Sequence, residues 1–344
     1  MSETQVQPRS LRAAGHSTVS AIGLGCMNLR HAYATPPLPQ QAAAVLERAV
    51  ALGITHFDTA ALYGFGANEE LLGRVLAPHR FRLFLASKGG IHGVTQDGQT
   101  RRVIDGRPAT LRQNCEDSLR RLRTEVIDLY YLHRWDRRVP IAESIGALAD
   151  LKREGKIRAI GLSEVSAATL LAAHAEHPIA AVQSEYSLCT RNPEIAVLET
   201  CRRIGAAFVA FSPLGRGFLT GTMGTEPVLQ ERDIRRAMPR FEPANFAANL
   251  GVLDVFRRLA MQAGSSPGQL AIAWLLSRGE HVLTIPGTTN LSHLEENVGA
   301  DVQALDEPLR AALDDLFAPG RLQGARYNAA TQAEVDSERF SDEH

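Results

Sequence analysis

The sequence predicts a single α/β domain, a (β/α)8 or TIM barrel with long loops at the carboxyl-terminal face of its strands. Eight short apolar runs recur along the 344 residues, and a segment with apolar residues at helical spacing follows each run. No linker or low-complexity tract interrupts this alternation. A doubly wound sheet would also alternate strands with helices, but eight strand–helix units are typical of the barrel.

The predicted strands are mostly continuous in hydrophobicity rather than alternating between apolar and polar residues. Such runs are typical of parallel strands that are covered on both faces. We expect the strands at 19–25, 54–59, 83–88, 127–133, 158–164, 181–187, 207–213 and 281–287.

The predicted helices carry apolar residues three or four positions apart. Residues 111–123, for example, place apolar side chains at spacings of four, four and three, which form one stripe along a helix. The same pattern predicts helices at 40–52, 68–77, 111–123, 141–154, 166–176, 193–204, 268–278 and 291–299. We expect Ser166 and Ser292 to cap two of these helices, with Glu295 completing a capping box at the second.

Two longer segments, 89–108 and 214–245, interrupt the rhythm, and each follows a predicted strand. In a barrel this position places them at the face where active-site loops lie. Residues 319–344 form a polar tail that we expect to be loop-like. The sequence thus predicts a barrel over 15–318 and a tail, together one domain over 1–344.

Composition limits the kinds of partner. Thirty-seven basic residues stand against 38 acidic ones, so the net charge of −1 predicts neither nucleic-acid nor membrane binding and favours a small molecule. The four cysteines have no metal-type spacing and are expected to be reduced packing residues, with no metal bound. No apolar leader or spanning run is present, which predicts a cytoplasmic protein; whether it is a monomer or a homo-oligomer stays open.

The candidate catalytic residues are found at strand ends. Asp58, Lys88 and His133 end three successive predicted strands, and Tyr63 follows Asp58 by five residues. Because the strand ends meet at one face of a barrel, we expect these four side chains to lie together in an active site.

This set suits the reduction of a carbonyl group. A free phenol has a pKa near ~10, so Tyr63 becomes a better proton donor if the charge of Lys88 stabilises its phenolate. Asp58 would keep Lys88 charged, and His133 would donate a hydrogen bond to the carbonyl oxygen. The alternative is a lyase in which Lys88 forms a Schiff base with its substrate.

A nicotinamide cofactor needs a separate binding site. Gly23-Leu24-Gly25 follows the first strand, but Asn28 stands where a Rossmann fingerprint has its third glycine. Segments 212–217 and 285–289 follow the seventh and eighth strands and are rich in glycine, proline and hydroxyl residues. These loops are the usual phosphate site of the barrel, so we expect the dinucleotide there.

With these residues in place, the chain closely resembles the aldo-keto reductase family over 15–318, in particular bacterial and fungal members with the SPLGRGFLTG loop, which are similar to pyridoxal and broad-specificity aldehyde reductases. The motifs that carry the resemblance are Phe57-Asp58-Thr59-Ala60 with Tyr63-Gly64, Ser87-Lys88, Leu132-His133, Ile160-Gly161-Leu162-Ser163, Gln183-Ser184-Glu185-Tyr186, Phe211 to Gly217, and Ile285-Pro286-Gly287 through Glu296-Asn297.

The resemblance implies an NADPH-dependent reductase of aldehydes and ketones without a metal, and it assigns the same roles to the four candidate catalytic residues. It implies that Ser163 and Gln183 hold the nicotinamide carboxamide and that Phe211, rather than Tyr186, stacks on the nicotinamide ring. The implied pyrophosphate contacts are Ser212, Leu214, Gly215, Arg216 and Gly217, and the implied adenosine contacts are Gly287, Thr288, His293, Glu296 and Asn297.

Some positions depart from the family pattern. Glu164 stands where many members have Asn at the carboxamide. His293 and Gly287 stand where others have Arg and Lys, and a neutral histidine is a weaker 2′-phosphate ligand than a fixed cation. NADPH is therefore expected, with NADH less favoured. Since some family members are channel-associated sensors, a non-catalytic cofactor-binding subunit is a second alternative.

Substrate contacts are expected from the variable loops. Met27, Tyr33, Trp135 and the tail around Tyr327 are the candidates. Trp135 is favoured among them because it lies two residues beyond His133.

Overall fold

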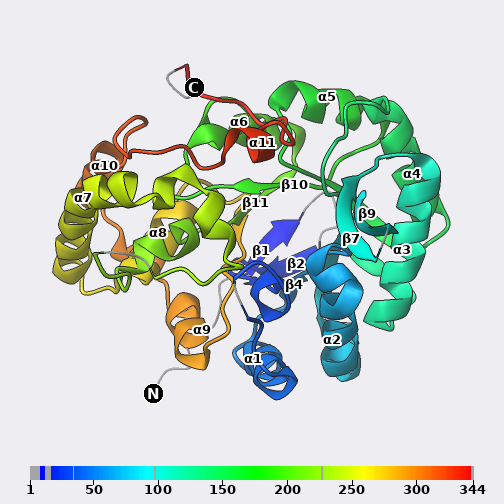
Figure 1. Ribbon diagram of the computed structural model, residues 1–344, viewed down its shortest axis with the longest axis horizontal. Helices are drawn as coiled ribbons and strands as arrows, with labels where there is room; N and C mark the ends of the chain where they lie inside the picture. Colours follow the sequence, from blue (N-terminus) through cyan, green and yellow to red (C-terminus); the bar gives the residue numbers. More distant parts are fainter. Residues whose placement is uncertain (1–7, 12–16, 34, 97, 226–227, 342–344) are drawn as a thin grey trace.

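A computed structural model describes residues 8–11, 17–33, 35–96, 98–225 and 228–341. Its main sheet has eight parallel strands in the order β12-β11-β10-β9-β8-β5-β4-β3, which confirms the predicted barrel class (Figure 1). The strands are β3 (Leu24–Gly25), β4 (His56–Asp58), β5 (Phe84–Gly89), β8 (Ile127–Leu132), β9 (Ile157–Ser163), β10 (Ala181–Glu185), β11 (Ala207–Phe211) and β12 (Val282–Thr284).

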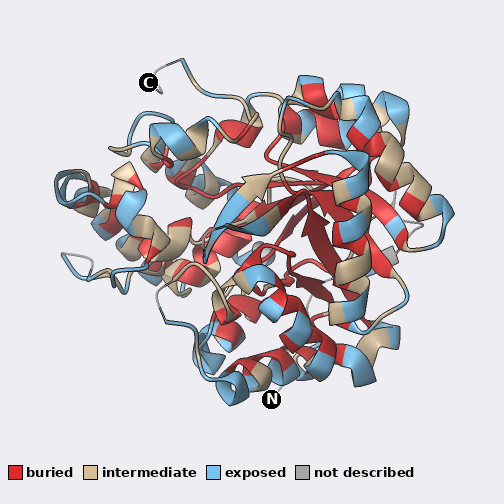
Figure 2. Cartoon of the chain, turned by 45° about the vertical axis from the view of Figure 1, so that its right-hand side comes forward, coloured by how far each residue is buried: buried red, intermediate tan, exposed pale blue. Residues whose placement is uncertain are grey.

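Eight helices run around the strands in chain order (Figure 1). They are α1 (Pro39–Ala51), α2 (Ala67–Leu76), α3 (Pro108–Leu122), α4 (Ile141–Arg153), α5 (Ala167–Glu176), α6 (Val197–Ile204), α8 (Pro267–Leu276) and α9 (Leu291–Val298). The strands are buried and the outer helix faces are exposed (Figure 2). This burial explains why the strands read as continuous apolar runs.

The sheet closes at a seam between β3 and β12, where strand pairing is minimal. Ile22 and Thr284 form an isolated parallel bridge. Gly23 N–H donates to the Thr284 carbonyl at 2.8 Å, and Gly25 N–H donates to the Pro286 carbonyl at 3.3 Å. A few backbone hydrogen bonds beside the two-residue strand β3 therefore complete the barrel.

The first predicted strand, 19–25, is corrected by the structure. Its first residues belong to β2 (Ser17–Ser20), which pairs antiparallel with β1 (Pro8–Leu11), and only β3 belongs to the barrel. A continuous apolar run cannot reveal this division, because both halves are buried. Residues 1–7, where we expected no leader segment, lie outside the described residues.

The segment 89–108 and the chain after β11 contain strands and helices that were not predicted from the sequence. Segment 89–108 forms an antiparallel hairpin of β6 (Ile91–Gln96) and β7 (Gln99–Ile104). The segment after β11 leads into α7 (Pro243–Gln262), and a further helix, α10 (Glu307–Leu316), follows α9. Both extra helices lie at the outer edge of the ring (Figure 1). Neither belongs to the strand–helix repeat, so the repeat did not predict them.

One of the two predicted helix caps is confirmed. Ser166 accepts a hydrogen bond from Thr169 N–H at 3.2 Å and begins α5. At α9 the prediction was wrong: Asn290 is the N-cap and accepts from Ser292 N–H at 2.8 Å, so Ser292 is already helical. The asparagine side chain competes for the same backbone donors and lies one residue before the helix.

The tail is more closely packed than its polar sequence predicts. It contains the short helix α11 (Ala329–Gln332), and Tyr327 and Val335 are buried. Asp336 accepts hydrogen bonds from the Ser166 and Thr169 hydroxyls at 3.0 and 2.7 Å, which attaches the tail to the start of α5. The barrel–tail boundary at 318 stays a prediction.

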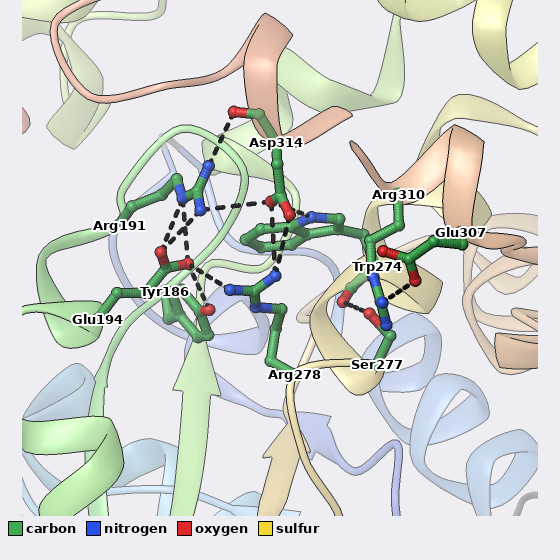
Figure 3. Close-up of polar contacts among 9 residues, drawn as sticks. All are labelled: Tyr186, Arg191, Glu194, Trp274, Ser277, Arg278, Glu307, Arg310 and Asp314. Carbon is green, nitrogen blue, oxygen red and sulfur yellow. Dashed lines mark hydrogen bonds and ion pairs between the residues drawn. The ribbon is translucent and has the colours of Figure 1, made fainter. Parts of the chain in front are cut away.

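A charged cluster fixes α10 to α8 and to the segment that follows β10 (Figure 3). Asp314 on α10 pairs with Arg191 at 3.3 Å and Arg278 at 3.2 Å, and it accepts from the Trp274 indole N–H at 3.0 Å. Both guanidinium groups lie over the Trp274 ring, 5.5 and 5.2 Å from its centre. Tyr186 donates a hydrogen bond to Glu194 at 2.7 Å in the same cluster, and its ring is packed in the hydrophobic core.

Candidate active site

The candidate catalytic side chains extend the inner layers of the barrel. Along β5, Phe84, Ala86 and Lys88 point to the same side because strand side chains alternate with a period of two. Phe84 and Ala86 belong to the apolar cluster that fills the barrel interior. Lys88 therefore emerges above this cluster, at the carboxyl-terminal mouth, as predicted from its position at a strand end.

Asp58, Tyr63 and Lys88 form one buried group. The Lys88 ammonium pairs with Asp58, donates to the Thr59 carbonyl at 2.8 Å and lies 3.4 Å from the Tyr63 hydroxyl. Gln183 Nε2 donates to the other Asp58 oxygen at 2.7 Å. His133 lies edge-on to the Tyr63 ring, with 6.0 Å between ring centres. The structure thus brings the four predicted residues together.

The electrostatics of this group keep a phenol beside a fixed cation. Burial raises the pKa of Tyr63 above its ordinary value, while the charge of Lys88 opposes this rise. Burial alone would lower the pKa of Lys88, but the Asp58 carboxylate and the Tyr63 oxygen hold it above its ordinary value. At neutral pH the site therefore contains a protonated phenol beside an ammonium that is paired with Asp58.

His133 is held as a neutral imidazole. Burial, together with the charge of Arg134, holds the pKa of His133 well below its ordinary 6.5. Its ring nitrogen Nδ1 is buried and has no hydrogen-bond partner among the described residues. A neutral imidazole can donate one hydrogen bond without placing a second cation beside Lys88.

A cavity of about 740 Å³ opens above the catalytic group. It is lined by Asp58, Tyr63 and His133 at one end and by the loops after β11 and β12 at the other. The predicted cofactor residues that line it are Ser163, Gln183, Phe211, Ser212, Leu214, Arg216, Gly217, Gly287, Thr288, His293, Glu296 and Asn297. Gly215 does not line it; this residue is buried beside Cys189.

Two glycines bring backbone segments close together at the cavity wall. A Cβ on Gly25 would lie 2.6 Å from the Ile285 carbonyl oxygen, and one on Gly287 would lie 2.7 Å from the Gly25 carbonyl oxygen. Only glycine allows the two backbone segments to approach so closely at the cavity wall. This part of the wall is therefore formed by backbone rather than by bulky side chains, which fits the close approach of a dinucleotide.

Arg216 differs from its expected role. Its guanidinium is buried, pairs with Glu185 at 2.7 Å and donates to the Tyr327 hydroxyl at 3.2 Å. The backbone of Arg216 has a φ of +57°, which turns the chain beneath the cavity. The charge of its guanidinium is therefore paired within the protein, and the expected contact of Arg216 with a pyrophosphate stays a prediction.

Glu164 does not line the cavity, and its carboxylate is bound by other parts of the chain. Its φ is +56°, and its carboxylate accepts from Arg326 at 2.6 Å and from Glu185 N–H at 2.8 Å. Both Glu164 and Arg326 are buried. Burial alone would raise the pKa of Glu164, but Arg326 holds it below its ordinary value. The tail thus anchors itself beneath the active site through one buried ion pair.

The predicted substrate residues divide into two groups. Met27, Tyr33 and Tyr327 line the cavity. Trp135 does not: its indole N–H donates to the Val139 carbonyl at 2.8 Å. The strand ends at Leu132, so spacing by two no longer places side chains on one face beyond it. Trp135, the favoured candidate, thus lies outside the lining of the cavity.

Several lining residues were not predicted from the sequence. They are Asn28, His31, Leu62, Ile91, Arg102, Arg134, Asn328, Thr331, Glu334 and Val335. Arg134 directly follows His133, so its position next to a strand end was a usable signal. The tail residues carry no local signal, because they reach the mouth only through long-range packing.

Three further findings concern metal binding, the cysteines and membrane-spanning helices. In the described part of the chain, no group of three His, Cys, Asp or Glu side chains could hold a metal ion. The four cysteines are free and buried, as expected for packing residues. No helix among the described residues is long and apolar enough to cross a membrane.

Comparisons with known proteins agree with this geometry. The model of the Aldo/keto reductase family matches residues 21–316. The chain is 42% identical to "Probable aldo-keto reductase 1" of Glycine max over 95% of this chain and 93% of that protein. It is 40% identical to "Aldo-keto reductase yakc [NADP(+)]" of Schizosaccharomyces pombe, over 92% and 94%.

Solved structures have the same architecture. A glycerol dehydrogenase from Gluconobacter oxydans superposes with a TM-score of 0.82 at 31% identity, over 92% of this chain and 96% of that one. An aldo-keto reductase from Bacillus halodurans in its holo form superposes with a TM-score of 0.74 at 26% identity, over 94% and 99%. The similarity therefore extends over nearly the whole chain.

Proposed function

The chain belongs to the aldo/keto reductase family, and from this we propose that it reduces aldehydes and ketones to alcohols with NADPH, with Tyr63 as the proton donor. Family membership supports oxidoreductase activity on carbonyl compounds. The observation that carries the finer proposal is the Tyr63 hydroxyl, 3.4 Å from the Lys88 ammonium at the floor of an extended cavity.

The residues divide the work between them. When bound, the reduced nicotinamide supplies a hydride, with its electron pair, to the carbonyl carbon. Tyr63 breaks its O–H bond and gives the proton to the carbonyl oxygen, so an alcohol forms. Lys88 stabilises the phenolate that remains until a proton from water restores it, and Asp58 keeps Lys88 in place. Neutral His133 donates a hydrogen bond that orients the carbonyl oxygen.

The cofactor would lie along the lined cavity. Ser163 and the side-chain oxygen of Gln183 would hold the carboxamide, since Gln183 Nε2 already donates a hydrogen bond to Asp58. Phe211 would stack on the ring, and the loop from Ser212 to Gly217 would surround the pyrophosphate. The adenosine end would meet Gly287, Thr288, His293, Glu296 and Asn297.

The dependence of carbonyl reduction on pH should be flat between pH 6.5 and 10. The pKa of His133 lies well below 6.5, so this residue stays neutral over the interval. The pKa of Tyr63 lies above 10.0, so the proton donor stays protonated and activity falls only at higher pH. Stopped-flow measurement of the hydride-transfer step across this range tests the expectation. A fall centred near neutral pH would contradict both assignments.

His293→Arg should lower the KM for NADPH more than the KM for NADH. His293 lines the cavity and is exposed, so an arginine there can place a fixed cation near a 2′-phosphate. Steady-state kinetics with both cofactors measure the difference, and His293→Gln serves as an uncharged control. Equal changes for the two cofactors would remove His293 from the 2′-phosphate site.

Two other functions have weaker support. A Schiff-base lyase needs a neutral lysine, whereas Lys88 is paired with Asp58 and its pKa is raised. Covalent trapping by borohydride with a carbonyl substrate would favour that function. A non-catalytic sensor would bind NADPH yet fail to consume it with 4-nitrobenzaldehyde, whereas a reductase consumes it. The same assay thus tests the proposed function directly.

A further inference from the structure

Four arginines line the cavity, and three of them are neutralised locally. Each of these three pairs with a carboxylate: Arg102 with Glu334, Arg216 with Glu185, and Arg235 with Asp233. Arg134 also lines the cavity, but it has no ion pair with any carboxylate among the described residues. It is therefore the exception among the arginines that line the cavity.

Neutral acceptors hold Arg134 in position. Its Nη1 donates to the His133 carbonyl at 2.6 Å and to the Ser163 hydroxyl at 3.0 Å. A guanidinium carries five N–H donors, and in the described part of the chain Nε and Nη2 make no hydrogen bond. The Arg134 side chain is half-buried beside His133. Its two hydrogen bonds fix its orientation and leave the N–H groups of Nε and Nη2 available to a ligand.

Glu164 lies within the electrostatic influence of Arg134, and its carboxylate is already engaged. The pKa of Glu164 is held down by Arg326 and, less strongly, by Arg134, against the effect of burial. Both Glu164 oxygens accept hydrogen bonds from Arg326. One carboxylate thus faces two guanidinium groups, which leaves a net positive charge at this end of the cavity.

The phosphates of a dinucleotide do not account for this charge. Arg134 follows β8, whereas the candidate phosphate loops follow β11 and β12, and β9 and β10 lie between them in the sheet. The charge of Arg134 instead acts on His133 and Tyr63, whose pKa values it lowers. Arg134 therefore belongs to the half of the cavity where the carbonyl group must lie.

We propose that the natural substrate is a carbonyl compound that also carries a carboxylate, which Arg134 binds through its free N–H groups while the carbonyl group faces Tyr63 and His133. This inference rests on the proposed reductase function. A guanidinium forms charge-assisted, often bidentate hydrogen bonds with a carboxylate, so the same contact gives affinity and orientation.

The kinetic test uses aldehydes that differ only in charge. Carboxybenzaldehydes and nitrobenzaldehydes, each as the 3- and 4-isomers, have nearly the same shape, but only the former are anionic. We expect Arg134→Met to lower kcat/KM for the preferred carboxybenzaldehyde roughly 10–100-fold more than for the nitrobenzaldehyde of the same isomer, mainly through KM, because any effect on Tyr63, His133 or Ser163 acts on both aldehydes alike. Arg134→Lys, which keeps the charge, should retain part of the preference.

A matched control removes a balanced pair from the same cavity. The double variant Arg102→Met with Glu334→Gln deletes one positive and one negative charge, so the substrate preference should stay within about 3-fold of wild type. An equal loss on both aldehydes in Arg134→Met would assign Arg134 to holding Ser163 and would overturn the proposal. A change of preference in the control as large as in Arg134→Met would also overturn it.

A binding measurement separates this inference from the proposed reaction. Calorimetry with 4-(hydroxymethyl)benzoate, the alcohol product, and cofactor-saturated protein should give an affinity that falls roughly 10–100-fold in Arg134→Met. If this fall is observed but neither aldehyde is reduced, the anion site stands and the reductase function fails. If nitrobenzaldehydes are reduced but the affinity is the same in both proteins, the function stands and the anion site is refuted.

Discussion

Tyr63→Phe is expected to lower kcat for carbonyl reduction by roughly 10²–10⁴-fold, the contribution of a positioned general acid. The substitution removes one hydroxyl, which lies 3.4 Å from the Lys88 ammonium, and keeps the ring that packs against His31 and His133. Cofactor binding should therefore change little. Steady-state rates with 4-nitrobenzaldehyde and NADPH titrations measure the two effects separately.

Tyr33→Phe is the matched control for this variant. Tyr33 also lines the cavity, but its hydroxyl lies 3.5 Å from Arg216 rather than beside Lys88. Its loss should change kcat by less than about 10-fold, because no proton transfer depends on it. Unchanged turnover in Tyr63→Phe, or an equal loss in both variants, would refute Tyr63 as the proton donor.

Arg326→Leu is expected to lower the free energy of unfolding by about 3–5 kcal/mol, the usual result of removing one partner of a buried ion pair. Glu164 would remain buried without its cation, at a position that also supports Ser163 and the backbone of Glu185. Denaturant unfolding followed by circular dichroism measures the loss. The tail should also become the first segment that a protease cleaves.

The double variant Arg326→Leu with Glu164→Gln tests the cause of this loss. Glutamine keeps an acceptor for Glu185 N–H but removes the charge, so most of the lost stability should return. If the double variant is as unstable as the single one, packing of the Arg326 side chain against Tyr327 accounts for the effect instead. The two variants together separate charge from shape.

The sequence predicted the site residues whose positions are fixed by the barrel strands. Asp58, Lys88 and His133 could be predicted because a strand end in a barrel points to the mouth wherever the loops go. Tyr63 follows a strand closely and is specified by the family motif. The same reasoning failed for Trp135, since the regular backbone ends at Leu132 and local hydrogen bonds decide its direction.

Features that depend on distant partners could not be predicted. The charge of Arg216 was expected at a phosphate, but Glu185 and Tyr327 bind it, and only the folded chain brings these groups together. The tail had few apolar residues, so its burial over the mouth carried no local signal. Arg134 could not be singled out from the sequence either, because only the folded chain shows that no carboxylate among the described residues pairs with it.

The short seam between β3 and β12 couples ligand binding to closure of the barrel. Residues on both edges of this seam also line the cavity: Gly25 on one edge, and Ile285, Pro286 and Gly287 on the other. A molecule bound in this part of the cavity would therefore contact both edges. Ligand at 100 times its dissociation constant adds about 2.7 kcal/mol to the folded state. Because few backbone hydrogen bonds join the two edges, we expect the empty barrel to open first at this seam.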